Sequence, residues 1–488
     1  MRPSSSPDPI QTVAPPGQDS GASAPQSVAV GPCERTLAWA LEAQASAELR
    51  FALLRGHEVG AGERAGSDFD LIVHPQDQSA WLACLEAACE QTGTRIVRRQ
   101  VSAHSTHLLL HAHPATGEHH FLAVDLHSAE VCYGVRFWGA DDLLPAAVRT
   151  PIARLRTDGE SPAVTAPALT PLWRELVRFW VGYLPAGSLR APLIETWQQA
   201  PKAERDAVAA ALLRLLGPHR SDAMLAALLQ GNREALVTQY KTVRRTLLAR
   251  RLRRAPLATL GQAVRFVWQA RVEPFWKPRG LCMAFLGTDG SGKSTLIEAV
   301  RSTLEPHFRD GGCHMHRLRP GLLPQINRLF HWKGVTYDAD DCSRPHRAAP
   351  SGAMGSALRT FWYALDCVIG WPLRILPRRR RNSLVIFDRY FHELQVDPRR
   401  ARIATTSPWP RLLARLVPRP DAIFVLIADT ERILARKQEL PADEVRRQVL
   451  GYGALASRDP RMTAVSTDGS LAESLDCVLQ RLFEERAA

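Results

Sequence analysis

Apolar residues follow two different patterns along the chain. Before residue 150, short apolar runs (FALLRG, FDLIVH, HFLAVDLH) alternate with a stretch of helical spacing, QDQSAWLACLEAACEQTG. This alternation of strand-like and helix-like segments predicts a small α/β domain over residues 33–150. From residue 276 onward, the runs LCMAFLG, SLVIFD and DAIFVLIAD are almost continuously apolar. Such runs are typical of parallel strands buried on both faces, so residues 276–488 predict a doubly wound parallel α/β sheet.

The two remaining parts of the chain have other patterns. Residues 151–275 lose the strand-like runs and keep helical spacing, as in LWRELVRFWVGYL and RDAVAAALLRLLG, which predicts a helical connector. Residues 1–32 are rich in Pro, Ser, Gly and Gln. Because so few of their side chains are large and apolar, burial cannot offset the cost of ordering them, and we expect a disordered tail.

Composition excludes some classes of protein and leaves others open. The chain has 488 residues, enough for more than one domain, and a formal charge of +13. This basic excess suits phosphate-rich ligands, anionic lipid or nucleic acid. Its nine cysteines are scattered without a CxxC pair, which favours neither a disulfide framework nor a structural zinc site. With no signal-peptide core and no charge-free apolar run of about 18 residues, we expect a cytoplasmic protein.

The strongest motif is the segment GTDGSGKST at residues 287–295, which fits G-x-x-x-x-G-K-[ST] in full. An apolar strand precedes it and a helix-like segment follows, as a phosphate-binding loop requires. Glycines let the backbone wrap around phosphates, Lys293 would neutralise the β- and γ-phosphates, and Ser294 would bind Mg²⁺. The expected nucleotide-binding residues are Gly287, Asp289, Gly290, Ser291, Gly292, Lys293, Ser294 and Thr295.

Together with two later motifs, this loop resembles the thymidylate kinases over residues 280–485. The second motif is Phe387-Asp388-Arg389-Tyr390, and the third is a strand at 422–428 followed by an arginine-bearing segment. The resemblance implies ATP and Mg²⁺ as cofactors and Asp289 and Asp388 near the acceptor and the metal. It also implies that Arg389 contacts a phosphate and that an arginine closes over the phosphates. The residues implied for these two roles are Arg389, Arg436, Arg446 and Arg447; as catalytic residues we expect Lys293, Asp388, Arg389 and Arg436.

The acceptor does not follow from the resemblance. Phe391-His392-Glu393 stands where thymidylate kinases have a small hydroxyl residue, and 327–376 has no recognisable thymine pocket. Arg317 or Arg319 could contact an acceptor phosphate. The segment VDPRR at 396–400 is similar to kinase-like proteins of bacterial surface-polysaccharide synthesis. We therefore expect a small-molecule phosphate acceptor, either a nucleoside monophosphate such as dTMP or a sugar-linked metabolite.

A second constellation of acids lies near the N-terminus. Asp68 and Asp70 are two residues apart in a predicted strand, so they share a face, and Asp125 lies on another predicted strand. Carboxylates that project together can hold the paired divalent ions of nucleotidyl transfer. Residues 45–140 thus resemble the minimal nucleotidyltransferase fold, which implies Asp68, Asp70 and Asp125 as metal ligands. Its Gly-Ser turn is absent, with Arg55-Gly56 the nearest equivalent, so a catalytically silent domain is the alternative.

Three further features have a structural interpretation. A group of histidines matches no closed metal site, and we expect a solvated hairpin at residues 104, 107, 111, 113, 119 and 120. The basic run 241–254 predicts a solvated helix face, with an anionic membrane or nucleic acid as the alternative partner. The apolar segment 358–376 predicts a core helix, or one that lies in a membrane interface.

Taken together, these patterns predict an ATP-dependent phosphotransferase with a fused nucleotidyltransferase-like domain. Nucleic acid is not an expected partner, whereas a peripheral membrane contact and a homodimer stay open. One alternative is a nucleotide-binding regulatory or assembly protein whose domains are catalytically silent. Another is a switch-type NTPase, which Asp388-Arg389 disfavours because it resembles an acceptor motif.

Overall fold

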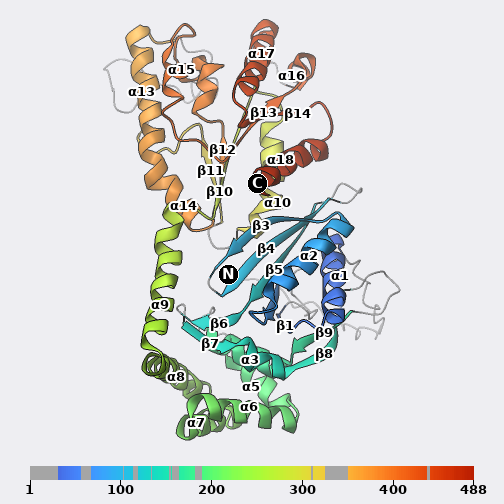
Figure 1. Cartoon of the computed structure of the whole chain (residues 1–488). Helices are drawn as coiled ribbons and strands as arrows, with labels where there is room; N and C mark the ends of the chain where they lie inside the picture. The colour runs from blue at the N-terminus through green and yellow to red at the C-terminus, as the bar shows by residue number, and fades with distance from the viewer. Residues whose placement is uncertain are drawn as a thin grey trace, which may run out of the picture.

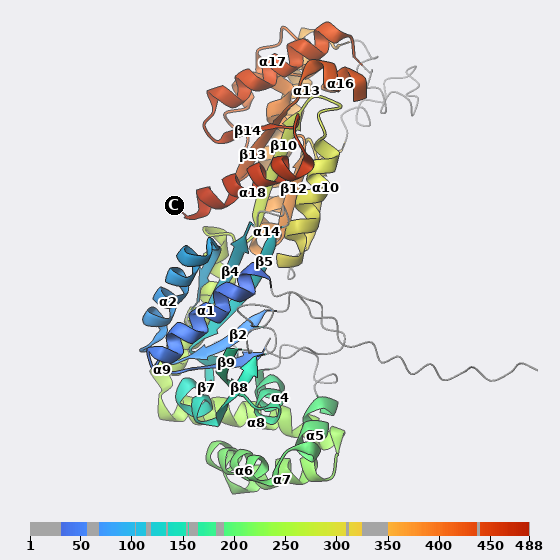
Figure 2. The ribbon, with the colours of Figure 1, turned by 90° about the vertical axis from the view of Figure 1, so that its right-hand side faces the viewer.

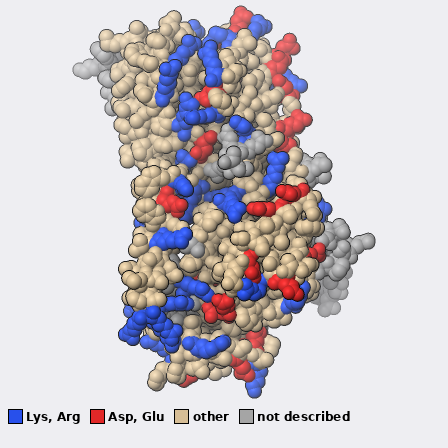
Figure 3. Space-filling view, viewed as in Figure 1, with Lys and Arg blue, Asp and Glu red and all other residues tan. Residues whose placement is uncertain are grey.

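The chain folds into three tiers, which Figure 1 shows one above another. The C-terminal domain is at the top, a second sheet lies in the middle, and a group of helices closes the bottom. On the same face, Lys and Arg side chains gather where the two sheets meet (Figure 3). The computed structural model describes residues 31–55, 68–102, 104–113, 119–132, 135–152, 155, 164–181, 190–308, 312–324, 350–436 and 440–487. The expected tail lies outside these residues except for Gly31 and Pro32, which cap and begin the first helix.

The N-terminal sheet has seven strands in the order β3-β4-β5-β2-β1-β9-β8. Its last two strands continue the sheet past residue 150, where we had expected only helices. The segment that forms β9, VTAPAL, is short and weakly apolar, so its alternation of buried and exposed residues is easily missed. The strands are β1 (Phe51–Arg55), β2 (Phe69–Val73), β3 (Arg95–Val101), β4 (Ser105–Ala112), β5 (His120–His127), β8 (Ala147–Ile152) and β9 (Val164–Leu169).

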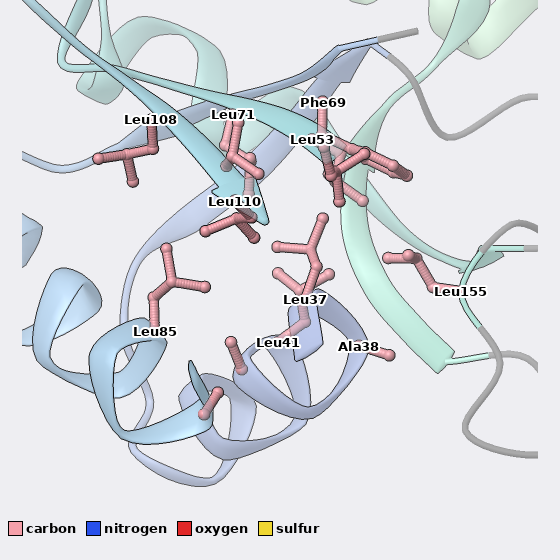
Figure 4. Packing of buried hydrophobic residues seen from close by; sticks show 14 of the residues in the cluster. Leu37, Ala38, Leu41, Leu53, Phe69, Leu71, Leu85, Leu108, Leu110 and Leu155 are labelled. Atoms are coloured by element: carbon pink, nitrogen blue, oxygen red, sulfur yellow. The ribbon is translucent and has the colours of Figure 1, made fainter. Parts of the chain in front are cut away.

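Two helices cover one face of this sheet, as Figure 2 shows from the side. They are α1 (Pro32–Ser46) and α2 (Gln78–Thr92). Their apolar residues pack against leucines of β1, β2 and β4 in the core drawn in Figure 4. Within β2, Phe69, Leu71 and Val73 all belong to this core. Because side chains alternate along a strand, Asp70 must then face the opposite side of the sheet.

The expected helical connector also supplies the second layer of the N-terminal domain. Its helices share a core with Ala52 and Leu54 of β1 and with Ile72 of β2, on the face opposite α1 and α2. From this bundle, α9 (Pro256–Val267) runs along the left edge of Figure 1 to the C-terminal domain. The bundle consists of α4 (Pro171–Val181), α5 (Arg190–Gln199), α6 (Lys202–Leu216), α7 (Pro218–Leu229) and α8 (Arg233–Arg254), below the small elements β6 (Ala129–Cys132), β7 (Val135–Gly139) and α3 (Ala140–Leu143).

The C-terminal domain is built on five parallel strands in the order β11-β12-β10-β13-β14. Every residue of β10 is buried, and alternate residues enter two separate cores above and below the sheet. The predicted parallel sheet, buried on both faces, is thus confirmed in this α/β domain. Its strands are β10 (Leu281–Gly287), β11 (Cys313–Arg317), β12 (Leu384–Asp388), β13 (Ala422–Ile427) and β14 (Met462–Ser466).

Helices cover both faces of this parallel sheet. The helices α10 (Lys293–Leu304) and α18 (Leu471–Ala487) share one core. The helices α13 (Ala353–Gly370) and α17 (Ala442–Arg458) contribute to the other. Helix α13 corresponds to most of the apolar segment 358–376, and it buries Ala364 and Cys367 while Phe361 stays exposed. Within the described part of the chain, no helix has the length and apolar character needed to cross a bilayer.

The N-terminal sheet contacts the C-terminal domain through β3, β4 and β5, which meet α18 and the segments beside β10, β12 and α10. From β3, the Arg98 guanidinium donates to the Arg279 carbonyl at 3.2 Å and to Asn382 Oδ1 at 2.5 Å. The same guanidinium lies over the Phe308 ring. Beside it, Phe121 of β5 contacts the rings of His307 and Phe483. The face of the N-terminal sheet that carries Asp70 is therefore turned toward the C-terminal domain.

Replacing Arg98 should loosen this contact between the domains. We expect Arg98→Ala to accelerate amide hydrogen exchange in β3 and α18, because both hydrogen bonds to the C-terminal domain are lost. The matched control is Arg99→Ala, since Arg99 forms only a surface pair with Glu86 in this region. Such pairs contribute about 0–1 kcal/mol, so the control should exchange like the parent protein. Equal exchange in the two variants would show that Arg98 does not hold the domains together.

Candidate functional site

The loop between β10 and α10 has the shape that a phosphate-binding loop requires. Gly287 and Gly292 have φ values of +147° and +86°, which only glycine adopts without strain. A Cβ on Gly287 would lie 2.8 Å from the Leu426 carbonyl oxygen, so the neighbouring strand also excludes a side chain there. The loop leads directly into Lys293, the first residue of α10, and its amides lie at the N-terminus of that helix. Such a terminus attracts anions.

Two buried polar side chains of the loop, Ser291 and Lys293, are suited to bind a phosphate. Lys293 is buried, and its ammonium donates to the carbonyls of Gly287 at 2.8 Å and Thr288 at 2.6 Å. Burial, with the nearby Arg389 guanidinium, lowers the pKa of Lys293 to about 7. The Ser291 hydroxyl is buried and has no hydrogen-bond partner among the described residues. A phosphate group would accept from both side chains and favour the charged lysine, so these residues fit a nucleotide phosphate.

Beside the loop lies a buried cluster of charges. Asp289 of the loop forms ion pairs with Arg389 and Arg400. Arg389 also pairs with the fully buried Glu393, and the Arg400 Nε lies 3.4 Å from Glu393 and 3.3 Å from Asp397. Burial alone would raise the pKa of Asp289, but the two guanidinium groups outweigh it and hold that pKa well below its usual range. For Glu393 burial prevails, and its pKa is raised.

The backbone at Arg389 is held in an unusual conformation. Its φ is +73°, a left-handed value that costs about 1–3 kcal/mol in a residue with a side chain. The Arg389 amide donates to the Phe285 carbonyl of β10 at 2.9 Å, and its carbonyl accepts from the Leu318 amide at 3.2 Å. These two bonds fix the peptide at the carboxyl end of β12. The sequence predicted Asp388 and Arg389 at this edge, and Asp388 indeed pairs in register with Phe285.

Two members of the cluster had no role in the sequence interpretation. Glu393 lies four residues after Arg389 in a short 3₁₀ helix (Phe391–Gln395), and Arg400 lies in the VDPRR segment. The segment that holds Glu393 departs from the thymidylate kinase pattern, and the segment that holds Arg400 carries the VDPRR resemblance. The sequence alone does not indicate which charged residues these two side chains bind. Asp289 and Arg400 are 111 positions apart, whereas Glu393 follows Arg389 by four positions. The sequence feature that could have indicated the cluster is an acid, Glu393, four residues after Arg389.

The predicted lid arginines take three different positions. Arg436 ends α16 (Thr430–Arg436), and its Nη1 lies 3.9 Å from where a Cβ on Gly292 would be. This places the guanidinium next to the phosphate loop. Arg447 binds Glu444 and donates to the Val396 carbonyl at 3.0 Å. Arg446 lies on the surface beside Asp443. The structure therefore brings only Arg436 of these three to the loop.

The two arginines suggested for an acceptor phosphate differ in their surroundings. Arg319 forms an ion pair at 3.1 Å with Asp366, which is fully buried in α13, and it also donates to the Leu323 carbonyl. These contacts fix the chain after β11 against α13. Arg317 ends β11 in register with Asp388. Of the two, Arg317 thus lies at the strand ends where the loop and Arg389 are found.

Three ionisable side chains meet on the N-terminal sheet. Asp70 of β2 and Asp125 of β5 lie in register on neighbouring parallel strands, and His127 follows two residues later on the same face. Their ligand atoms lie within 4.8 Å of one another. The Arg55 Nε is 2.8 Å from Asp70, and His107 Nδ1 is 2.8 Å from Asp125. Oxygen-rich groups of this kind suit Mg²⁺ or Mn²⁺.

Asp68 lies beside this group on the wall of a cavity of about 540 Å³. Asp68, His107 and Asp125 line one side, and the other side belongs to the C-terminal domain. The basic residues on that second side are Arg279, Arg380 and Arg381. Carboxylates opposite arginines fit a ligand that carries a metal-bound phosphate, because each group would meet the opposite charge. The sequence predicted the acids but not this second wall.

The expected solvated hairpin of histidines is covered by the C-terminal domain only in part, because the side chains of His107 and His113 remain 42% and 46% exposed. His111 is 8% exposed, and the His119 side chain is 5% exposed. The His111 ring contacts the ring of Phe483, which belongs to α18. The spacing of the histidines describes one hairpin only. It cannot show that a helix of another domain packs against that hairpin.

Comparisons with known proteins identify no family for this chain. No family model matches the chain, and a search of curated proteins found no similar sequence. Among solved structures, a thymidylate kinase from Ehrlichia chaffeensis matches with 17% identity. The match covers 42% of this chain and 100% of that kinase, with a TM-score of 0.30.

Removing one cation from the buried cluster should destabilise the C-terminal domain. We expect Arg389→Ala to lower the free energy of unfolding by about 3–5 kcal/mol, because Asp289 and the buried Glu393 would both lose a charged partner and would depend on Arg400. Urea denaturation measures this, with the exposed Arg399→Ala as the matched control near zero. The double variant Arg389→Met/Glu393→Gln should recover part of the loss. Additive losses would mean that the pair does not interact.

Proposed function

We propose that the chain is an ATP-dependent phosphotransferase that transfers the γ-phosphoryl group to a small acceptor. One observation carries this proposal: Asp289 of the phosphate loop is bound by both Arg389 and Arg400. The donor loop and a pair of guanidinium groups thus lie at one edge of the sheet. Phosphoryl transfer depends on cations arranged around the moving group, and planar guanidinium groups bind its oxygens in pairs.

The residues divide into a donor side and an acceptor side. The loop amides and Lys293 would bind the β- and γ-phosphates, and the hydroxyl of Ser294, an exposed residue, would bind Mg²⁺. When bound with ATP, Mg²⁺ neutralises charge on the phosphate oxygens. Arg389 would contact the transferred or acceptor phosphate from the other side. Arg436, next to Gly292, would close over the donor. The acceptor is a nucleoside monophosphate such as dTMP or a sugar-linked metabolite.

The N-terminal domain supports a second function, nucleotidyl transfer. The observation that favours it is the register of Asp70 with Asp125 on neighbouring strands, with Asp68 on the adjoining cavity wall. These acids would hold divalent ions, and Arg380 and Arg381 across the cavity would bind the phosphates of the nucleotide. His127, which contacts Asp70, would be a further ligand of these ions. The alternative is a domain that binds a nucleotide but catalyses no reaction of it.

Turnover of ATP in the presence of acceptors tests the main proposal. Purified full chain with ATP and Mg²⁺ would be supplied with nucleoside monophosphates, sugars and sugar phosphates in turn, and ADP release measured. We expect one acceptor class to raise the rate at least tenfold, and Lys293→Ala to abolish the increase because the phosphates lose their cation. The control Lys202→Ala changes an exposed lysine of α6 and should behave as the parent. Tight ATP binding without any acceptor effect would favour the regulatory alternative.

The two active regions should be separable by mutation. We expect Asp68→Ala and Asp125→Asn to leave acceptor-stimulated ADP formation unchanged, because both residues lie on the N-terminal sheet. The same variants should lose any release of pyrophosphate from nucleoside triphosphates, which is the product of nucleotidyl transfer. If Asp125→Asn stops ADP formation while ATP binding persists, the domains act as one catalytic unit. If pyrophosphate release survives both variants, these acids are not its metal ligands.

A further inference from the structure

Three potential metal ligands meet where the N-terminal sheet contacts α18. His113 follows the end of β4 and His119 precedes β5, so both lie at one end of the same hairpin. Asp476 reaches them from α18 of the C-terminal domain. The ligand atoms of these three side chains lie within 4.8 Å of one another. The group is separate from Asp70, Asp125 and His127, which form a different cluster.

The two imidazoles approach the two oxygens of one carboxylate. His119 Nε2 is 2.7 Å from Asp476 Oδ1, and His113 Nε2 is 3.0 Å from Asp476 Oδ2. Two ligands bound at about 2.0–2.2 Å to a tetrahedral ion lie about 3.3–3.6 Å apart. The side chains therefore need to separate by less than about 1 Å for all three to bind one ion.

The direction of the groups distinguishes this arrangement from an ordinary ion pair. His119 Nε2 and Asp476 Oδ1 are both buried and only 2.7 Å apart, yet their alignment is too poor for a regular hydrogen bond. In contrast, His74 Nε2 and Asp141 Oδ1 form a regular hydrogen bond at 3.2 Å. Poor alignment of two close polar atoms is compatible with both binding an ion that lies beside them.

The second nitrogen of His119 is held as in many metal sites. His119 Nδ1 lies 2.9 Å from His111 Nε2, and the two rings stack with centroids 5.2 Å apart. A metal-binding histidine commonly uses its other nitrogen in a hydrogen bond that fixes the ring. Because the His119 side chain is 5% exposed, its ring has little freedom to turn away.

We propose that His113, His119 and Asp476 bind a divalent transition-metal ion, of which Zn²⁺ is the best match, across the domain interface. Two imidazoles and one carboxylate are ligands that Zn²⁺ prefers, whereas Mg²⁺ favours oxygen alone. The three side chains leave a fourth position for water. With ligands from both domains, the ion would attach the β4–β5 hairpin to α18. It would thus strengthen the contact that Phe121 and Phe483 make nearby.

Zinc titration of the full chain tests the proposal. Chelator-treated protein carrying Asp125→Asn, which weakens the other cluster, would be titrated with Zn²⁺ by calorimetry, without nucleotide. We expect one Zn²⁺ per chain. Loss of an outer partner of a metal ligand already costs about 10–100-fold in affinity, so His119→Gln and Asp476→Asn should cost at least about tenfold. His113→Ala, at a half-exposed side chain, gives a variant whose folding should not be affected.

Two control variants make the result specific. His74→Gln removes a histidine from a hydrogen-bonded His–Asp pair, and Glu473→Gln changes another acid of α18. Neither should alter Zn²⁺ affinity. A second readout is hydrogen exchange in α18, which Zn²⁺ should slow in the parent but not in His119→Gln. Absence of Zn²⁺ binding, or binding that the ligand variants leave intact, would overturn the site. Binding without slower exchange would overturn its role between the domains.

Discussion

The alternation of side chains along the strands determines where the acidic site of the N-terminal sheet can lie. In β2, the leucine and aromatic residues that pack under α1 and α2 leave Asp70 only the opposite face. The same holds for β5, where Val124 and Leu126 enter that core and Asp125 and His127 do not. The polar face cannot remain bare over its whole length, because Phe121 lies on it too. Docking against the C-terminal domain buries that ring and places the acids beside an arginine-lined cavity.

In the C-terminal domain, the corresponding constraint is charge balance in a buried place. Three cations, Lys293, Arg389 and Arg400, face three carboxylates, Asp289, Glu393 and Asp397. Unpaired charges would be costly there, so the cluster is stable only as a balanced set. An arriving phosphate adds negative charge and disturbs that balance. Additional positive charge is then needed near the phosphates of the donor. Mg²⁺ and the exposed Arg436 would supply it.

Local patterns allowed the sequence to predict the parallel sheet and the phosphate loop, because both depend on neighbouring residues. The strand β10, the glycines and Lys293 lie within a dozen positions, and their geometry follows from steric rules. The strand β9 escaped prediction because it pairs with β8 and β1 while carrying a weak pattern of its own. The partners of Asp289 and His119 also escaped, since Arg400 and Asp476 reach them only through the tertiary fold.

Two packed helices, α10 and α18, connect the phosphate loop to the interface between the domains. Helix α10 begins at Lys293 and buries Val300 in the same core as Leu479 of α18. Helix α18 in turn presents Phe483 and Asp476 to the β4–β5 hairpin. Close-packed helices transmit displacement because their cores have few voids to absorb it. Any shift of α10 on phosphate binding must therefore be accommodated at α18, and the residues that fix α18 to the N-terminal sheet decide whether that sheet moves with it.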